Sequence, residues 1–249
     1  MTVNALVLAG SRPGGDPFAR EVGVAHKGLI EVGGKPILAH VIGALREARC
    51  GRILVCCEPG PVEELAHELG AETIPPAAGP SQSVLRAVDA CGTPMLITTS
   101  DHALLRAEWI TALVDQAPDD CDVALMLAER TRIEAAVPDS RRTYLRFADG
   151  QWSGCNLFLL RTPAARRAVE EWTRVEAERK RPWRLAMRLG LRTLFDYLVG
   201  RLGVADAISR IGSRMGVRAA LVAAPSGLAA VDVDKMEDLV LVRAIFADG

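Results

Sequence analysis

The chain has 249 residues, of which 49% are hydrophobic and 24% are charged, and its formal net charge at pH 7 is −1. This length suits one large α/β domain or two small ones, and the apolar share can bury a sizeable core, which argues against disorder over most of the chain. The near-neutral charge gives no indication of a nucleic-acid partner.

Strands and helices alternate in the first half of the sequence. The predicted strands cover residues 5–9, 53–57, 72–74, 95–99 and 122–127, and the predicted helices cover 36–49, 62–69 and 81–91. We expect Ser81 or Ser83 to cap the last of these helices. Alternation of this kind predicts a mostly parallel sheet with helices on both faces, whose ligands bind at the carboxyl ends of the strands. The loops after Ala9 and Thr99 are therefore the first places to search for chemistry.

The pattern changes after about residue 130. Two strands flank a turn at Asp149-Gly150, and helical patterns follow before a final strand and helix. The predicted ranges are strands at 144–147, 156–160 and 217–223, and helices at 162–178, 182–214 and 236–246. We interpret residues 1–249 as a single domain with a helical insertion at about 162–216.

Nothing in the sequence predicts export or membrane insertion. The N-terminus lacks a basic region followed by a cleavable apolar segment, and no apolar stretch reaches the ~18 residues of a membrane helix. The cysteines form no C-x-x-C pair and lie in or beside apolar runs, as buried thiols do in a reducing compartment. We expect a cytoplasmic protein. The cysteines are Cys50, Cys56, Cys57, Cys91, Cys121 and Cys155.

A glycine-rich loop follows the first strand. The run LVLAG ends at Gly10, the loop carries Arg12, Gly14 and Gly15, and Lys27 precedes a second glycine turn. Glycines let backbone N–H groups approach phosphate oxygens, and Arg and Lys supply compensating charge. The spacing matches neither a P-loop nor a dinucleotide fingerprint. The alternative is a surface loop that merely joins a strand to a helix.

The run from LVLAG to HKGLIEVGGKPILAHVIGAL resembles the signature of the molybdenum-cofactor guanylyltransferase-like NTP transferases. The resemblance implies a Rossmann-like three-layer sandwich of the nucleotide-diphospho-sugar transferase type, with a mostly parallel mixed sheet. It implies that the glycine loop and its arginine hold a triphosphate and that the motif lysine contacts phosphate. Because the loop is longer than usual in this family, either Arg12 or Arg20 could hold the phosphates. The residues concerned are Leu8, Ala9, Gly10, Arg12, Gly14, Gly15 and Lys27.

Two aspartates complete the expected metal site. The pattern T-T-S-D-H-x-L-L around Asp101 resembles the first metal motif of the family, and AAVDVDKMEDL resembles its closing motif. We expect Asp232 and Asp234 to alternate along a strand, with Asp234 as the second ligand of Mg²⁺, or of Mn²⁺ in its place. Glu237 and Asp238 then favour the dipole of the closing helix. The alternative for either metal aspartate is a helix cap or a turn.

The resemblance also places the two substrate pockets. The segment that contains Gly79, Gln82 and Ser83 resembles the base-reading segment, although plain helix capping explains it equally well. Gly154 and Asn156 resemble the glycine–asparagine segment beside the acceptor. Nearby basic and aromatic residues either grip an acceptor phosphate or form an exposed basic face. They are Arg141, Arg142, Tyr144 and Arg146.

Residues 179–218 carry ten basic residues interleaved with apolar ones, against Asp196 and Asp206. Three interpretations stay open: a core-facing helix with a solvated basic face, a lid over a phosphate-rich acceptor, and a basic amphipathic helix on anionic lipid.

The expected activity is transfer of a nucleoside monophosphate from an NTP, with GTP or CTP favoured, to a small phosphorylated acceptor with release of pyrophosphate. Lys27, Arg12 and Asp101 are the expected catalytic residues. The alternatives are a glycosyltransferase on the same fold and a nucleotide-binding protein without catalysis.

Overall fold

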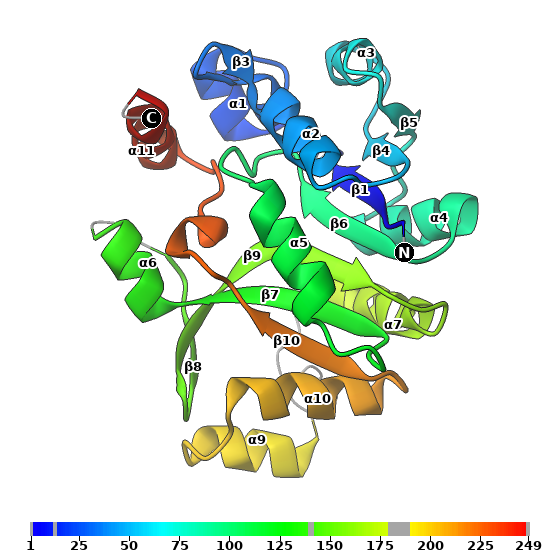
Figure 1. Cartoon of the computed structure of the whole chain (residues 1–249), viewed down its shortest axis with the longest axis vertical. Coiled ribbons are helices and arrows are strands. Elements are labelled where there is room, and N and C mark those ends of the chain that lie inside the picture. Colours follow the sequence, from blue (N-terminus) through cyan, green and yellow to red (C-terminus); the bar gives the residue numbers. More distant parts are fainter. Residues whose placement is uncertain (1, 12–13, 139–141, 179–189, 248–249) are drawn as a thin grey trace.

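The structure is a computed structural model that describes residues 2–11, 14–138, 142–178 and 190–247. A central sheet crosses the molecule, with α2 and α5 on one face and α4 and α7 on the other (Figure 1). The predicted three-layer α/β sandwich is confirmed. The helices are α1 (Pro17–Val22), α2 (Ile37–Glu47), α3 (Pro61–Glu68), α4 (Pro80–Cys91), α5 (Ala107–Gln116), α6 (Arg130–Ala136), α7 (Ala165–Glu178), α9 (Leu191–Leu198), α10 (Val204–Arg214) and α11 (Met236–Ala247), with short 3-10 turns η1 (Lys27–Leu29) and η2 (Gly227–Ala230).

The main sheet has the strand order β10-β7-β9-β6-β1-β4-β5, and β8 pairs with β9. Strand β9 runs antiparallel to both β6 and β7, whereas β10–β7, β6–β1, β1–β4 and β4–β5 are parallel pairs. The sheet is therefore mostly parallel and mixed, as predicted. Its strands are β1 (Asn4–Leu8), β4 (Ile53–Cys56), β5 (Glu72–Ile74), β6 (Met95–Thr99), β7 (Val123–Glu129), β8 (Leu145–Phe147), β9 (Gly150–Leu160) and β10 (Ala219–Ala223).

Strand β1 supplies side chains to the cores on both faces of the sheet. Ala5 and Val7 pack with α2 and α5, and Leu6 packs on the opposite face with residues of α4 and α7. All three residues are fully buried. A parallel strand covered by helices on both faces reads as a continuous apolar run, which is why residues 5–9 were recognisable.

Helix α4 begins differently from the prediction. Its N-cap is Gly79, and Pro80 occupies the first helical position. The Ser83 hydroxyl instead donates to the Gly79 carbonyl and accepts from the Ala77 N–H, and Ser81 donates to Glu176 of α7 at 2.5 Å. Neither serine is the N-cap, because the fixed φ of proline starts the helix one residue before Ser81.

The helix predicted over 182–214 is interrupted. Residues 182–189 lie outside the described part of the chain, and the remainder forms α9 and α10. Gly200, with φ 68°, ends the first helix in the left-handed region. Leu202 is then buried, and its carbonyl accepts from the Ala148 N–H, which anchors the connection on the β8–β9 turn. Within the described ranges, no helix is long and apolar enough to cross a membrane.

Candidate active site

Three segments far apart in the sequence meet at the carboxyl edge of the sheet. Lys27 lies on η1, Asp101 follows β6, and Asp234 lies just before α11. The Lys27 Nζ donates to Asp101 Oδ2 at 2.6 Å and to Asp234 Oδ1 at 2.5 Å. The structure thus brings together the lysine and both aspartates singled out in the sequence.

Close backbone packing places Lys27 beside the Asp101 loop. The Nδ1 atom of His26 accepts from the Gly28 N–H at 3.0 Å, which starts η1. A Cβ at Gly28 would lie 3.3 Å from the Cβ of Ser100, tighter than ordinary contact. Only glycine lets η1 approach this closely without displacing its neighbours.

The Asp234 segment is joined to the Asp101 loop through the main chain. The Val233 N–H donates to the Asp101 carbonyl at 3.0 Å, and the Asp234 N–H donates to Asp238 Oδ2 at 3.2 Å. The prediction that Asp232 and Asp234 lie on a strand is wrong, because these backbone groups bond to a loop and a side chain. Glu237 and Asp238 both lie in the first turn of α11, as expected.

Opposing effects set the charges of this cluster. Burial alone would lower the pKa of Lys27, but the Asp101 and Asp234 carboxylates outweigh it and raise that pKa above its ordinary value. Burial would raise the pKa of Asp101, yet the Lys27 ammonium holds it below its ordinary value. Both groups are therefore charged at neutral pH. Burial also lowers the pKa of His102 to about 4, so that its ring is neutral.

The two carboxylates have the chemistry of a magnesium site. Mg²⁺ binds in proteins through one or two carboxylates and completes its shell with phosphate oxygens and water. Asp101 Oδ1 is buried and has no hydrogen-bond partner among the described residues. The described ranges contain no cluster of three or more His, Cys, Asp or Glu side chains suited to a metal. Asp101 and Asp234 therefore fit an ion that is bound together with a phosphorylated ligand.

A second group of hydrogen-bonded side chains, centred on Asp232, lies next to Asp234 in the sequence. Arg142 donates to Asp232 Oδ1 at 2.6 Å, Asn156 Nδ2 donates to Asp232 Oδ2 at 3.0 Å, and Arg142 also lies 3.6 Å from Asp238 Oδ1. The Arg142 side chain is only 10% exposed. Arg142 thus pairs with carboxylates instead of projecting freely toward an acceptor. The sequence holds no signal for this contact, because Arg142 and Asp232 are 90 residues apart.

The glycine loop begins beside Asp101. Leu8 pairs with Thr99 in the parallel register of β1 and β6, so Ala9 and Gly10 leave the sheet next to the loop that carries Asp101. Gly14 and Gly15 lie further along this loop, with φ of 88° and 77° in the left-handed region that glycine tolerates. Arg20, the other candidate for the phosphates, lies after the loop in α1. Arg12 lies outside the described residues.

The residues predicted to contact the nucleotide base and the acceptor lie on α4 and β9. Gln82 is exposed in the first turn of α4, whereas Ser83 is buried and uses its hydroxyl on the backbone. Gly154 is exposed on β9 opposite Leu127, and Asn156 adopts a left-handed φ of 48° while it binds Asp232. Glu176 of α7, which the sequence analysis missed, accepts a hydrogen bond from Ser81, the residue before Gln82 in α4.

The strand order, with the antiparallel strand β9 inside a parallel sheet, is that of the nucleotide-diphospho-sugar transferase fold. Residues 5–180 match the family model of the MobA-like NTP transferase domain, and the chain therefore belongs to that family. The predictions of family and fold are both confirmed. A search among curated proteins found no match.

Solved structures agree with this assignment. A hypothetical transferase from Thermus thermophilus is 32% identical, with a TM-score of 0.83 over 96% of this chain and 100% of that one. CMP:2-keto-3-deoxy-manno-octonic acid synthetase, solved with CTP, is 17% identical, with a TM-score of 0.60 over 100% and 99% of the two chains. 2-C-methyl-D-erythritol 4-phosphate cytidylyltransferase, also from Thermus thermophilus, is 16% identical, with a TM-score of 0.56 over 99% and 100%. The last two likenesses concern the fold alone.

Proposed function

We propose that this protein transfers a nucleoside monophosphate from GTP or CTP to a small phosphorylated acceptor and releases pyrophosphate. The observation that carries the proposal is the convergence of Lys27, Asp101 and Asp234 at the carboxyl edge of the sheet, in a chain of the NTP transferase family. Two structural neighbours are a CTP-bound synthetase and a cytidylyltransferase, which supports CTP. The family resemblance supports GTP.

Asp101 and Asp234 would hold Mg²⁺, for which Mn²⁺ could substitute. When bound, the ion offsets the negative charge of the phosphate groups. Lys27 is charged at neutral pH and lies between the same carboxylates, so its ammonium can bind a phosphate oxygen of the bound nucleotide. This charge becomes more valuable as negative charge builds up on the departing pyrophosphate.

The reaction is a displacement at phosphorus. An oxygen of the acceptor phosphate forms a bond to the α-phosphorus, the bond from that phosphorus to the β-bridging oxygen breaks, and pyrophosphate leaves with the electron pair. A phosphate oxygen is already ionised near neutral pH, so no general base is required. His102, which is buried beside Asp101, has no proton-transfer role in this scheme.

The loops at the sheet edge would position the substrates. Backbone N–H groups at Gly10, Gly14 and Gly15 would bind the triphosphate, with Arg12 or Arg20 supplying charge. We assign the base contact to Gln82, which is exposed at the N-terminus of α4, because the hydroxyl of Ser83 is already engaged.

On the acceptor side we propose Gly154 for close approach to the substrate. Asn156 would orient the Asp232 carboxylate that it contacts, next to the bound acceptor.

Pyrophosphate release tests the proposal. The full chain is incubated with each of the four NTPs, pooled phosphorylated metabolites and Mg²⁺, and pyrophosphate is measured. We expect release with GTP or CTP only when an acceptor is present. As a control, the surface variant Glu134→Gln should release pyrophosphate at the wild-type rate. Consumption of a nucleotide-sugar without pyrophosphate would favour a glycosyltransferase, and nucleotide binding without turnover would favour a non-catalytic protein.

A further inference from the structure

Helix α9 presents apolar side chains to solvent. Phe195 is 60% exposed, Leu198 73% and Val199 46%, and their spacing of three and four residues puts them on one side of the helix. Figure 1 shows α9 at the opposite end of the molecule from α1, α2 and α3. Exposed large apolar side chains grouped on one side of a helix make this surface a candidate for binding.

Two exposed arginines flank these apolar side chains along the chain. Arg192 lies on α9 three residues before Phe195, whereas Arg201 lies just after the end of the helix, beyond Gly200. Neither arginine has a carboxylate within ion-pair distance among the residues that the structure describes. The nearby Asp196 is turned inward, where it pairs with Arg210 of α10 at 2.5 Å. The outward surface is therefore apolar with a positive charge at each end.

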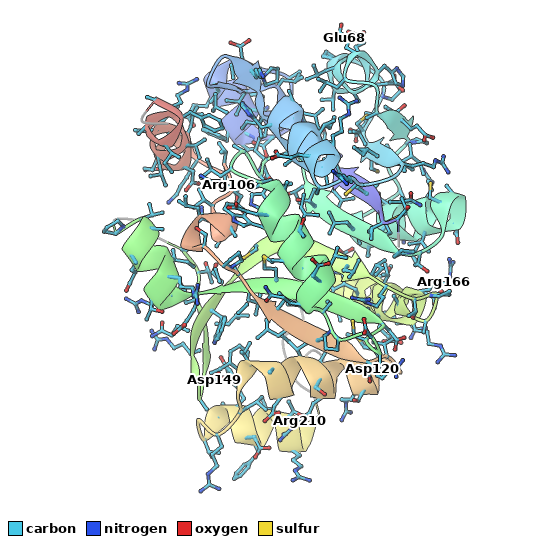
Figure 2. The ribbon with its side chains drawn as sticks, in the orientation of Figure 1. Glu68, Arg106, Asp120, Asp149, Arg166 and Arg210 are labelled. Carbon is cyan, nitrogen blue, oxygen red and sulfur yellow. The ribbon has the colours of Figure 1, made fainter. Side chains whose placement is uncertain are left out.

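The opposite side of α9 is firmly attached to the rest of the molecule. Thr193 is buried, and the ring of Tyr197 meets that of Phe147 on β8 edge to face at 5.8 Å. Figure 2 places Arg210 between α10 and α9, and Asp149 at the adjoining end of β8, where it accepts from the Val204 N–H. The helix is thus held in place by these contacts, while none of the described segments covers its outward residues.

We propose that this surface, made of Arg192, Phe195, Leu198, Val199 and Arg201, docks the protein onto an anionic phospholipid bilayer. Apolar side chains on a helix face, with an exposed arginine before them and another just after the helix, suit the boundary between acyl chains and headgroups, where arginines meet phosphate. A second copy of the chain fits less well. A symmetric dimer through this surface would place the arginines of one copy against those of the other.

Binding through so short a helix should be weak, reversible and dependent on ionic strength. It would also leave the candidate active site accessible, because α9 and the start of α11 lie at different ends of the molecule (Figure 1). The proposal stands independently of the transfer reaction, since it rests on the surface of α9 alone.

Co-sedimentation with vesicles provides the test. The full chain is mixed with vesicles of phosphatidylcholine alone or of phosphatidylcholine with phosphatidylglycerol. We expect binding only to the anionic vesicles, and release at high salt. The double variant Phe195→Ser/Leu198→Ser should bind at least about tenfold more weakly, since two apolar side chains no longer leave water. Arg192→Gln/Arg201→Gln should lose the preference for anionic vesicles.

Trp172→Ser is the matched control, because Trp172 is 53% exposed but lies on α7. Vesicle binding by this control should equal that of the wild type, and circular dichroism checks that every variant is folded. If the serine double variant fails to fold, the arginine double variant decides the question.

The proposal is overturned if the wild type ignores anionic vesicles, or if the α9 variants bind as the control does. It is also overturned if light scattering shows a wild-type dimer that the α9 variants dissociate. None of these results bears on the pyrophosphate assay.

Discussion

Lys27 is the residue on which the proposed chemistry most depends. It contacts both aspartates while its side chain is only 16% exposed, so its charge is held in one place. A fixed charge stabilises a transition state better than a mobile one, because it does not have to reorganise during the reaction.

Replacing this ammonium should abolish most of the activity. We expect Lys27→Met and Asp101→Asn each to lower kcat by on the order of 10²-fold, as loss of a charge-stabilising group does. Steady-state release of pyrophosphate measures the effect, with Lys35→Met as the surface control. Wild-type rates in both variants would refute these assignments.

Gly28 tests whether close packing positions Lys27. An added Cβ would lie 3.2 Å from His26 Nδ1 and 3.3 Å from Ser100 Cβ. Gly28→Ala should therefore displace η1 and lower kcat about tenfold, because small misplacements of reacting groups are costly. Gly43→Ala is the control: Gly43 lies inside α2 with open space around it, so this change should raise the free energy of unfolding by about 0.5–1 kcal/mol. Equal kcat in the two variants would contradict the argument.

At the scale of elements, Arg142 connects the segment before β8 to the segment before α11. Arg142→Gln leaves Asp232 without its cationic partner, which should cost about 3 kcal/mol of stability and lower kcat by misplacing Asp234. The control is Arg161→Gln. The Arg161 side chain is likewise mostly covered, at 13% exposed, but it binds the carbonyls of Val114 and Ala117 at the end of α5.

Measuring thermal unfolding and kcat for both variants separates the loss of stability from the misplacement of Asp234. Both variants should melt at lower temperature, and only Arg142→Gln should lose activity. A similar loss of kcat in Arg161→Gln would mean that destabilisation alone explains the result.

Asp122 connects β7, β9 and β10 at the sheet edge opposite the candidate active site. Its carboxylate accepts from the Arg218 N–H at 2.8 Å and from the Thr162 hydroxyl at 2.7 Å, just before β10 and just after β9. These hydrogen bonds hold the pKa of Asp122 below its ordinary value. Ionised Asp122 therefore stabilises the fold above about pH 4, and this contribution disappears as the pH falls through the lowered pKa.

Asp122→Asn should accordingly lower the free energy of unfolding at pH 7 by about 1–3 kcal/mol. The difference between wild type and variant should shrink below about pH 4, where the wild-type carboxyl is protonated as well. Urea titrations of both proteins across this range measure it. A difference independent of pH would show that the charge of Asp122 is not what matters.

Elements were predictable where the signal is local. The runs at 5–9, 53–57 and 95–99 became β1, β4 and β6 because burial on both faces demands unbroken apolar residues. Strand β9 was recognised only from residue 156 onward, because the left-handed Asn156 and a register shift against β7 break its alternation.

The part of the candidate site that was predictable also has a local signal in the sequence. Lys27, Asp101 and Asp234 each stand in a motif that is continuous in sequence. The Arg142–Asp232 pair and the contact of Glu176 with Ser81 join segments 90 and 95 residues apart. No periodicity or spacing encodes such contacts; they depend on how whole elements pack.

At the scale of the whole molecule, the site closes a loop through nearly the entire chain, since Lys27 and Asp234 are 207 residues apart. A ligand that binds all three segments should stabilise the fold as a unit. An NTP at about 100 times its Kd adds about 2.7 kcal/mol, which raises Tm by roughly 5–10 °C for a chain of this size. Thermal unfolding with GTP or CTP and Mg²⁺ measures the rise.

The stabilisation of the fold by Mg²⁺ should depend on whether the nucleotide is bound, and the reverse. Without nucleotide, Lys27 already forms ion pairs with both Asp101 and Asp234 and competes with a cation for them, so Mg²⁺ alone should shift Tm very little. With a triphosphate present, phosphate oxygens share the Lys27 ammonium, and the ion gains phosphate oxygens as ligands beside the two carboxylates. Tm should therefore rise far more with the pair of ligands than the separate shifts predict, and EDTA or Asp234→Asn should remove most of the excess. Shifts that simply add would mean that the nucleotide and the ion do not share the Lys27 site.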